Sequence, residues 1–172
     1  NAGFGHLGDF STNSWEKEAQ MIQLNITALT QLTKLFLPDM ISRGHGKIMN
    51  VASVASFMPG PLMAVYYATK AFVLSFSEAI NAEVCGKGVT VTALCPGPTA
   101  SGFQDAADMK GIKLVEKFKM PSSKVVAECG YKAMMKGKAV AIHGFMNRLM
   151  VASLRVSPRG LVVKMVKWVQ KK

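Results

Sequence analysis

Apolar side chains recur at helical spacing in the first forty residues of this chain. They predict one long helix over residues 13–41 with a single apolar face, formed by Trp15, Ile22, Leu29, Leu32 and Phe36. Asn13 followed three residues later by Glu16 is typical of a helix start. Two glycines, Gly44 and Gly46, end the pattern.

The next segments alternate between short apolar runs and longer helical patterns. Residues 47–51, 89–95 and 139–142 predict buried strands, while residues 64–84 and 122–135 predict helices. A strand, a long helix and a second strand in succession require a crossover connection and a parallel sheet. The pattern therefore predicts an α/β fold.

Tyr66 and Lys70 form the most informative pair in the chain. Residues four apart on a helix share one face, so the Lys70 ammonium is expected beside the Tyr66 phenol. A nearby positive charge favours the phenolate, and we expect it to lower the pKa of Tyr66 toward neutrality. Such a phenol can donate or accept a proton. A Tyr and a Lys at this spacing also occur by chance, so the pair needs supporting context.

That context comes from the ends of the predicted strands. Asn1, Ser53 and the turn of Pro96 and Gly97 all fall where a strand ends. Ligands of parallel sheets bind beyond the carboxyl ends of the strands. We therefore expect these residues to meet at one edge of the sheet.

Five motifs occur together in this order: Asn1-Ala2-Gly3, Asn25 within a helix, Ser53 after a strand, Tyr66 with Lys70, and Pro96-Gly97. From the first residue to about Gly144 the chain resembles the short-chain dehydrogenase/reductase family. The resemblance implies a Rossmann-like, doubly wound parallel sheet. It departs from the family where Ala52 precedes Ser53, since many members have two serines there.

The family's Gly-rich turn for the cofactor pyrophosphate does not occur in this sequence. We therefore expect residues 1–172 to be a single partial domain, a fragment that lacks the N-terminal strands. The residue that chooses between NAD and NADP belongs to that missing part. The expected cofactor is NADP or NAD, with NADP favoured.

The resemblance implies a role for each motif residue. Tyr66 would exchange the proton, Lys70 would tune it, Ser53 would hold the substrate oxygen, and Asn25 would hold a water linked to Lys70. The residues expected to bind cofactor are Asn1, Gly3, Tyr66, Lys70, Pro96, Gly97 and Thr99. The implied reaction is hydride transfer between a nicotinamide and a carbonyl/alcohol pair.

Residues 100–120 are irregular, and we weigh two interpretations of them: a flap over the substrate, as in the family, or a solvated charged helix. Several large apolar residues could line a substrate pocket or equally belong to the core: Phe57, Met58, Met63, Phe103, Met109 and Met120. Ser56 is a weaker alternative to Ser53, and His6 is more typical of a surface loop than of a substrate contact.

Composition narrows the class further. Hydrophobic residues make up 49% and charged residues 18%, which is typical of a globular domain. No uninterrupted apolar run is long enough to span a membrane. The three cysteines and three histidines form no metal-ligand motif, so no metal is predicted. Reduced thiols and a cytoplasmic location are the expectation.

Residues 145–172 differ from the rest of the chain. They hold seven of the 21 basic residues and none of the ten acidic ones, interleaved with apolar side chains and Trp168. This basic amphipathic extension suits peripheral contact with an anionic membrane, a dimer contact, a lid on a substrate channel or ordinary packing on the sheet. No nucleic-acid recognition module accompanies the charge. The extension resembles the bacterial branch related to long-chain 3-oxoacyl reductases.

The sequence therefore predicts an NAD(P)-dependent oxidoreductase acting on a small-molecule carbonyl or alcohol, with a hydrophobic substrate favoured. A homo-oligomer is implied by the family. Two alternatives remain: a protein that keeps the fold only for binding or membrane attachment, and a fragment that is inactive.

Overall fold

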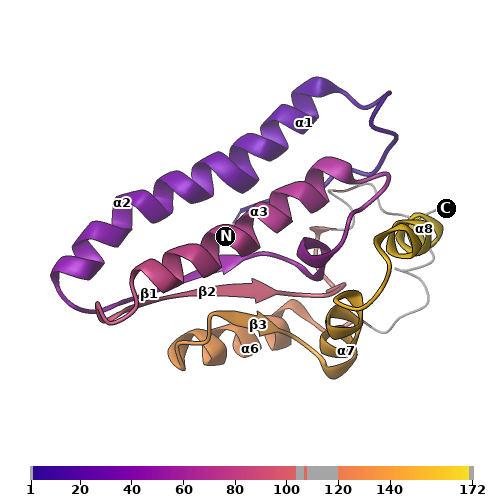
Figure 1. Cartoon of the computed structure of the whole chain (residues 1–172). Coiled ribbons are helices and arrows are strands. Elements are labelled where there is room, and N and C mark those ends of the chain that lie inside the picture. Colours follow the sequence, from indigo (N-terminus) through magenta and orange to yellow (C-terminus); the bar gives the residue numbers. More distant parts are fainter. Residues whose placement is uncertain (1, 104–106, 108–119, 171–172) are drawn as a thin grey trace.

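The computed structural model describes residues 2–103, 107 and 120–170. Its centre is a parallel sheet of β1 (Gly46–Val51), β2 (Val89–Cys95) and β3 (Val140–Ile142), in the order β1-β2-β3 (Figure 1). The predicted α/β class and all three predicted strands are confirmed, with boundaries that differ by at most one residue.

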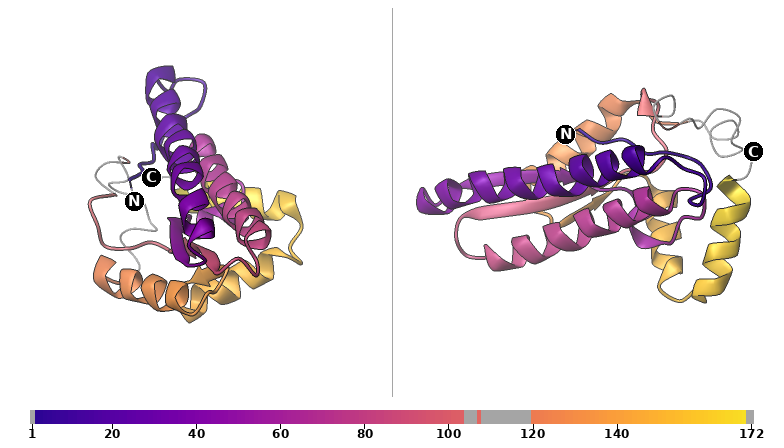
Figure 2. Two further views of the ribbon diagram at one scale, coloured as in Figure 1. Left: turned by 90° about the vertical axis from the view of Figure 1, so that its left-hand side faces the viewer. Right: turned by 90° about the horizontal axis from the view of Figure 1, so that it is seen from above.

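Helices cover both faces of the sheet (Figure 2). α2 (Leu29–Ser42) and α3 (Ala64–Glu83) lie on one face, and α6 (Ser123–Met135) lies on the other. Side chains of β2 alternate between these layers, as the strand period of two requires. Ala93 and Cys95 pack with α3, whereas Leu94 packs with α6. The sheet is therefore doubly wound, as predicted.

The long N-terminal helix consists of α1 (Trp15–Ile22), a π-helical segment η1 (Gln23–Ala28) and α2. The predicted apolar face is wrong at three positions: Trp15, Leu32 and Phe36 are 67%, 54% and 53% exposed. The buried positions of this long helix are largely polar: Glu18, Met21, Asn25 and Thr33. A search for apolar residues misses such a face, and the π segment also shifts the helical phase.

The helix also starts later than Asn13. Ser14 is the N-cap and accepts a hydrogen bond from the backbone N–H of Lys17. The Asn13 Nδ2 instead donates to Glu18 Oε1 at 2.8 Å, so its amide holds the buried glutamate rather than the helix end.

The chain leaves β3 into α7 (Phe145–Leu154) and then α8 (Arg159–Gln170), which lie near the carboxyl ends of the strands (Figure 1). Each helix buries valines against the domain: Val151 in α7, and Val162 and Val166 in α8. α7 also contacts the short 3-10 helix η2 (Val54–Phe57) that follows β1. Among the described residues, no helix is both long enough and apolar enough to cross a bilayer.

Candidate active site

Ser53 stands at the carboxyl end of β1, where η2 begins. Its side chain accepts a hydrogen bond from the N–H of Ala55, and its Oγ lies 3.5 Å from the carbonyl oxygen of Pro96. The neighbouring Val54 N–H donates to the same carbonyl at 2.9 Å. Ser53 thus lies between the ends of β1 and β2, as its position in the sequence predicts.

Tyr66 and Lys70 lie in the first turns of α3, on the side facing Ser53. The Lys70 Nζ is 5.9 Å from the centre of the Tyr66 ring. It donates a hydrogen bond to the carbonyl oxygen of Val51 at 2.8 Å, which fixes it to the last residue of β1. Lys70 is only 7% exposed. The three residues expected to do the chemistry therefore share one corner of the sheet.

Burial, rather than the lysine charge, determines the ionisation of this pair. Removal from water raises the pKa of the Tyr66 phenol to about 12, although a hydrogen bond with Ser53 partly opposes the rise. Burial also lowers the pKa of Lys70 to about 8. The expectation that Lys70 lowers the pKa of Tyr66 is therefore wrong, because burial is the main cause of the shift at each group and the charge of Lys70 is not among the causes at Tyr66.

Asn25 lies in η1, the part of the long N-terminal helix that contacts α3. Its Nδ2 donates to the carbonyl oxygen of Phe4 and to Thr69 Oγ1, each at 3.1 Å. Thr69 Oγ1 in turn donates to the backbone carbonyl of Tyr66 at 2.8 Å. Asn25 is therefore connected to the helix turn that carries the phenol. Thr69 was missed from the sequence, because a threonine inside a helix gives no functional signal.

Gly3 brings the N-terminal loop against the same group. A β-carbon at this position would lie 2.9 Å from Asn25 Oδ1 and 3.7 Å from Lys70 Nζ. Asn25 Oδ1 is buried and has no hydrogen-bond partner among the described residues. The absence of a side chain at Gly3 lets the N-terminal loop approach the Asn25 amide and the Lys70 ammonium closely.

Ser56, the weaker alternative to Ser53, has a positioning role instead. Its Oγ donates to the backbone carbonyl of Lys70 at 2.7 Å and accepts from the N–H of Ser53 at 3.3 Å. It therefore connects the start of η2 to α3. A serine three residues after an N-cap serine is the sequence signal for this bond.

The remaining residues expected to bind cofactor are Asn1, Pro96, Gly97 and Thr99. Asn1 lies outside the described residues. Pro96 and Gly97 follow β2 as predicted, and Thr99 Oγ1 donates to the Gly97 carbonyl at 2.9 Å. A β-carbon on Gly97 would lie 2.5 Å from the Asn147 side chain of α7, so this turn packs tightly against the C-terminal extension.

An apolar group borders the Tyr66 ring. The Phe103 ring lies 5.3 Å from the Tyr66 ring, centre to centre, and Leu7, Met63, Tyr67 and Ala107 complete the cluster. Met63 and Phe103, for which the sequence left pocket and core open, belong to this buried cluster beside Tyr66, whereas Phe57 packs with the main core. Met109 and most of residues 100–120, interpreted as a flap or a charged helix, lie outside the described residues.

Tyr67 has a partner that its neighbours in sequence do not reveal. Gln170, the last residue of α8, donates from Nε2 to the Tyr67 hydroxyl at 2.7 Å. Burial raises the pKa of Tyr67 to about 12. The bond joins residues 103 positions apart, so no local pattern could have predicted it.

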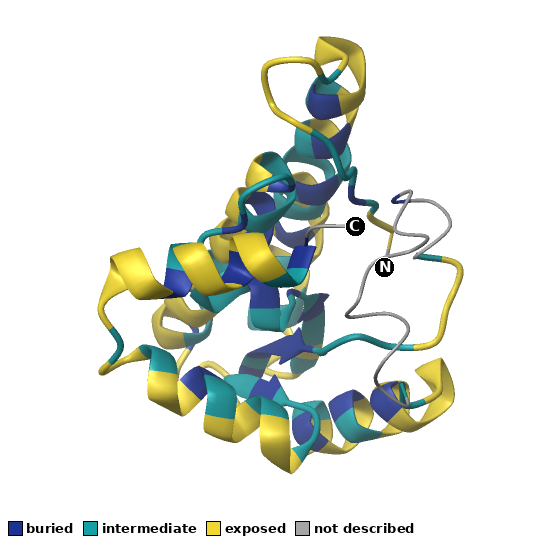
Figure 3. Cartoon of the chain, turned by 90° about the vertical axis from the view of Figure 1, so that its right-hand side faces the viewer, coloured by how far each residue is buried: buried dark blue, intermediate teal, exposed yellow. Residues whose placement is uncertain are grey.

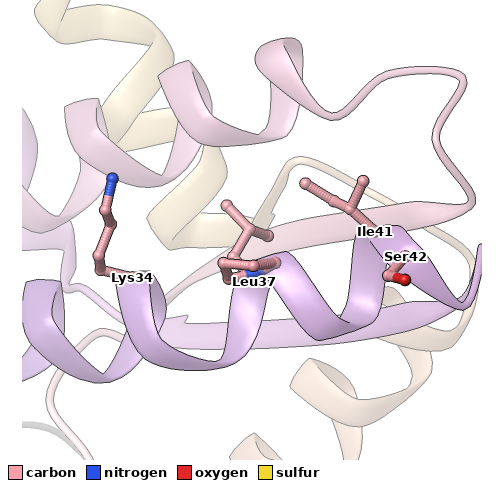
Figure 4. Close-up of a pocket in the computed structure, with 5 residues that line it drawn as sticks. Lys34, Leu37, Ile41 and Ser42 are labelled. Carbon is pink, nitrogen blue, oxygen red and sulfur yellow. The ribbon is translucent and has the colours of Figure 1, made fainter.

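A separate open hollow runs along α2 and is lined by Lys34, Leu37, Pro38, Ile41 and Ser42 (Figure 4). None of the candidate catalytic residues lines it. Its walls are mainly apolar, and Lys34 is their one ionisable side chain. Within the described part of the chain, no cluster of His, Cys, Asp and Glu could hold a metal ion.

Comparison with known proteins identifies the family. The model of the short chain dehydrogenase family matches residues 1–110, which is more than half of the chain. The chain belongs to the short-chain dehydrogenase family. The similarity of its fold to solved members of the family also extends beyond residue 110.

Among relatives, ketoacyl reductase HetN of Nostoc sp. is 36% identical over 97 residues, covering 56% of this chain and 34% of HetN. Mouse 17-beta-hydroxysteroid dehydrogenase type 3 is 35% identical over 117 residues, covering 68% of this chain and 38% of the mouse protein. Mouse very-long-chain 3-oxoacyl-CoA reductase is 29% identical over 86% of this chain and 45% of its own length. The chain thus spans less than half the length of these relatives.

Solved structures extend the similarity to nearly the whole chain. A short-chain dehydrogenase from Sphingobium yanoikuyae in complex with NADPH matches 94% of this chain and 62% of its own, with a TM-score of 0.79 and 29% identity. A 7beta-hydroxysteroid dehydrogenase matches with the same TM-score at 20% identity, which shows the shared fold.

Proposed function

We propose that the protein is an NAD(P)-dependent oxidoreductase that interconverts a carbonyl and a secondary alcohol on a hydrophobic substrate. One observation supports this above all: Ser53, Tyr66 and Lys70 converge at the carboxyl ends of β1 and β2. A hydroxyl, a phenol and an ammonium in one buried corner can hold a carbonyl oxygen and move one proton.

Tyr66 is the proposed proton donor. Because burial raises its pKa to about 12, the phenol carries its proton at neutral pH and can give it to a carbonyl oxygen during reduction. The reverse reaction needs the phenolate, so alcohol oxidation should gain from alkaline pH.

Ser53 and Lys70 have supporting roles in this proposal. The Ser53 hydroxyl would hold the substrate oxygen near the phenol and stabilise negative charge that develops on it. The Lys70 ammonium is held by the Val51 carbonyl within 5.9 Å of the Tyr66 ring centre, where a positive charge opposes the cost of forming phenolate.

A nicotinamide cofactor, which supplies or accepts the hydride, fits the residues around Gly3. A side chain at Gly3 would occupy the space beside Asn25 Oδ1 and Lys70 Nζ, and these two groups suit a water and a ribose hydroxyl. Lys70 and Tyr66 would hold the ribose, Asn25 the water, and Asn1, Gly3, Pro96, Gly97 and Thr99 the remaining contacts. Similar solved structures contain NADPH, NADP or NAD, which supports a nicotinamide cofactor, and NADP remains the slightly favoured choice.

A hydrophobic substrate is supported by the group of Leu7, Met63, Phe103 and Ala107 beside the phenol. Aromatic and aliphatic side chains there favour an apolar ligand over a sugar or an amino acid. The relatives named as ketoacyl, 17-beta-hydroxysteroid and very-long-chain 3-oxoacyl-CoA enzymes point to the same class.

The test is oxidation of NADPH or NADH by the purified protein in the presence of apolar ketones and 3-oxoacyl thioesters. We expect turnover with at least one apolar ketone, faster with NADPH, and almost none for Ser53→Ala. Equal rates for the wild type and this variant would overturn the proposed site. Cofactor binding without any turnover would favour the alternative of a non-catalytic member of the fold.

A further inference from the structure

α8 buries one face against the domain and exposes large apolar side chains on the other. The inward face consists of Val162, Val166 and Gln170, which are 5%, 6% and 3% exposed. Gln170 fixes this face in place by its hydrogen bond to the Tyr67 hydroxyl. The orientation of the helix on the domain is therefore set by these inward contacts.

The outward face of α8 carries Leu161, Met165 and Trp168, which lie four and three residues apart and so share one side of the helix. They are 61%, 47% and 63% exposed. Exposing large apolar side chains at helical spacing is unfavourable in water and marks an interaction surface.

α7 continues this surface. Phe145, Met146 and Leu149 are 75%, 71% and 53% exposed, and Val156 in the connection to α8 is 86% exposed. Figure 3 shows α7 and α8 on the same face of the molecule, with large exposed areas on both helices. We call these outward residues of α7, α8 and their connection the extension surface.

The charged side chains of residues 145–172 are all positive, and among the described residues an acid that interacts with one of them is Asp9 of the N-terminal loop, whose pKa is lowered by hydrogen bonds from Ser11 and in part by Lys167. Arg148, Arg155, Arg159, Lys164 and Lys167 are all exposed, and residues 145–172 contain no acidic residue. A second copy docked face to face through a two-fold axis would place these cations against each other. A surface of negative charge with an apolar interior beneath it complements both features.

We propose that the extension surface docks on an anionic lipid bilayer. Apolar side chains of an interfacial helix enter the boundary between headgroups and acyl chains, while flanking Lys and Arg contact the anionic headgroups. Docking does not depend on the proposed reductase activity, although the bond of Gln170 to Tyr67 places the docked helix directly beside the proposed site.

The first experiment measures co-sedimentation of the purified protein with vesicles of phosphatidylcholine, with and without phosphatidylglycerol. We expect binding only with phosphatidylglycerol, weakened by added salt because the headgroup attraction is screened. No binding to the anionic vesicles, or equal binding to both kinds, would overturn the proposal.

Variants locate the contact. Leu161→Ser with Met165→Ser should weaken vesicle binding about tenfold or more, because apolar area is lost from the buried side of the interfacial helix. The matched control is Leu35→Ser with Phe36→Ser, two residues of α2 that are 66% and 53% exposed on another part of the molecule. This control should bind vesicles as the wild type does. An equal loss in both double variants would contradict the proposal.

A second, independent pair tests the charge. Arg159→Gln with Lys164→Gln should weaken binding about tenfold or more, whereas Lys17→Gln with Lys34→Gln on α1 and α2 should weaken it much less. If the serine double variant has a lowered melting temperature, this pair of charge variants still tests docking through the extension surface. Similar losses in the two charge variants would show only a general attraction of a basic protein, and would overturn docking through this surface.

Fluorescence gives a local readout. The chain has two tryptophans, so Trp15→Phe leaves Trp168 as the sole reporter. Its emission should shift to shorter wavelength when anionic vesicles are added, because the indole leaves water. An unchanged spectrum during binding would exclude contact through α8. If sedimentation equilibrium instead showed a wild-type oligomer that Leu161→Ser with Met165→Ser dissociates, a second copy would be the occupant.

Discussion

The catalytic corner and the extension surface use their polar and apolar groups in opposite ways. In the corner, Asn25, Thr69 and Lys70 are 7% exposed or less, and backbone or side-chain partners hold them in place. On the extension surface, large apolar side chains and cations both face solvent. Proton transfer needs polar groups removed from water, whereas attachment needs apolar groups that can leave it. The contrast separates the proposed catalytic site from the proposed membrane contact.

Ser53→Ala should strongly reduce turnover. We expect turnover to fall about 100- to 1000-fold, because one hydrogen-bond donor to a developing oxyanion is lost. Ser56→Ala is the matched control, since Ser56 bonds backbone groups of Lys70 and Ser53. Ser56→Ala should lower the melting temperature, and it should reduce turnover much less than Ser53→Ala does. A larger loss of turnover in Ser56→Ala than in Ser53→Ala would contradict the assignment.

Lys70→Met should stabilise the ligand-free protein while removing activity. The folded pKa of about 8 lies below the unfolded value of 10.5, so the unfolded state holds more protons between these pH values. Below pH 8 the shift corresponds to a cost of about 3 kcal/mol, and removing Lys70 also deprives the Val51 carbonyl of its hydrogen-bond donor, a loss of about 1 kcal/mol. We expect a gain of about 2 kcal/mol at pH 7.

The pH dependence checks that reasoning. Wild-type stability should rise relative to the variant as pH increases from 8 to 10.5, because the wild type loses the cost of a buried charge. Urea unfolding at several pH values measures both. A variant less stable than the wild type at pH 7, with a difference independent of pH, would contradict burial as the cause.

Val166→Ala and Met165→Ala test the two faces of α8 with adjacent residues. Val166 is 6% exposed and Met165 is 47% exposed. The first change should cost about 1 to 2 kcal/mol of unfolding free energy through lost burial, and the second less than about 0.5 kcal/mol. Thermal melts give the answer. Equal costs would mean that the outward face is also part of the packed domain.

Tyr67→Phe should give a small effect, about 1 kcal/mol, because it removes the hydroxyl that accepts the hydrogen bond from Gln170. Urea denaturation of this variant beside Gln170→Leu and the double variant measures the coupling. Two single losses that simply add in the double variant would show that the two groups do not interact.

Much of the fold was predictable because it depends on local patterns. The β-branched run of β2 and the glycines after α3 gave boundaries within one residue. The corner of the sheet was also predictable, since parallel strands bring their carboxyl ends together. The family's motifs then indicated which residues at that corner to examine.

Features set by tertiary contacts were not predictable. The inward side of α1 and η1 buries Glu18 and Asn25, so apolar spacing indicated the wrong face. The bond of Gln170 to Tyr67 joins distant parts of the chain, and the pKa of Tyr66 depends on how deeply α3 is buried. Sequence spacing showed that Lys70 approaches Tyr66, but not that desolvation would outweigh its charge.

The most direct test of the central claim is the turnover number of Tyr66→Phe measured beside that of Tyr67→Phe, with an apolar ketone and NADPH. Both changes remove one hydroxyl from a tyrosine of α3, but only Tyr66 lies beside Ser53 and Lys70. The account predicts a loss of about 100- to 10,000-fold for Tyr66→Phe with cofactor affinity largely retained, and little loss for Tyr67→Phe. Full turnover in Tyr66→Phe would contradict it.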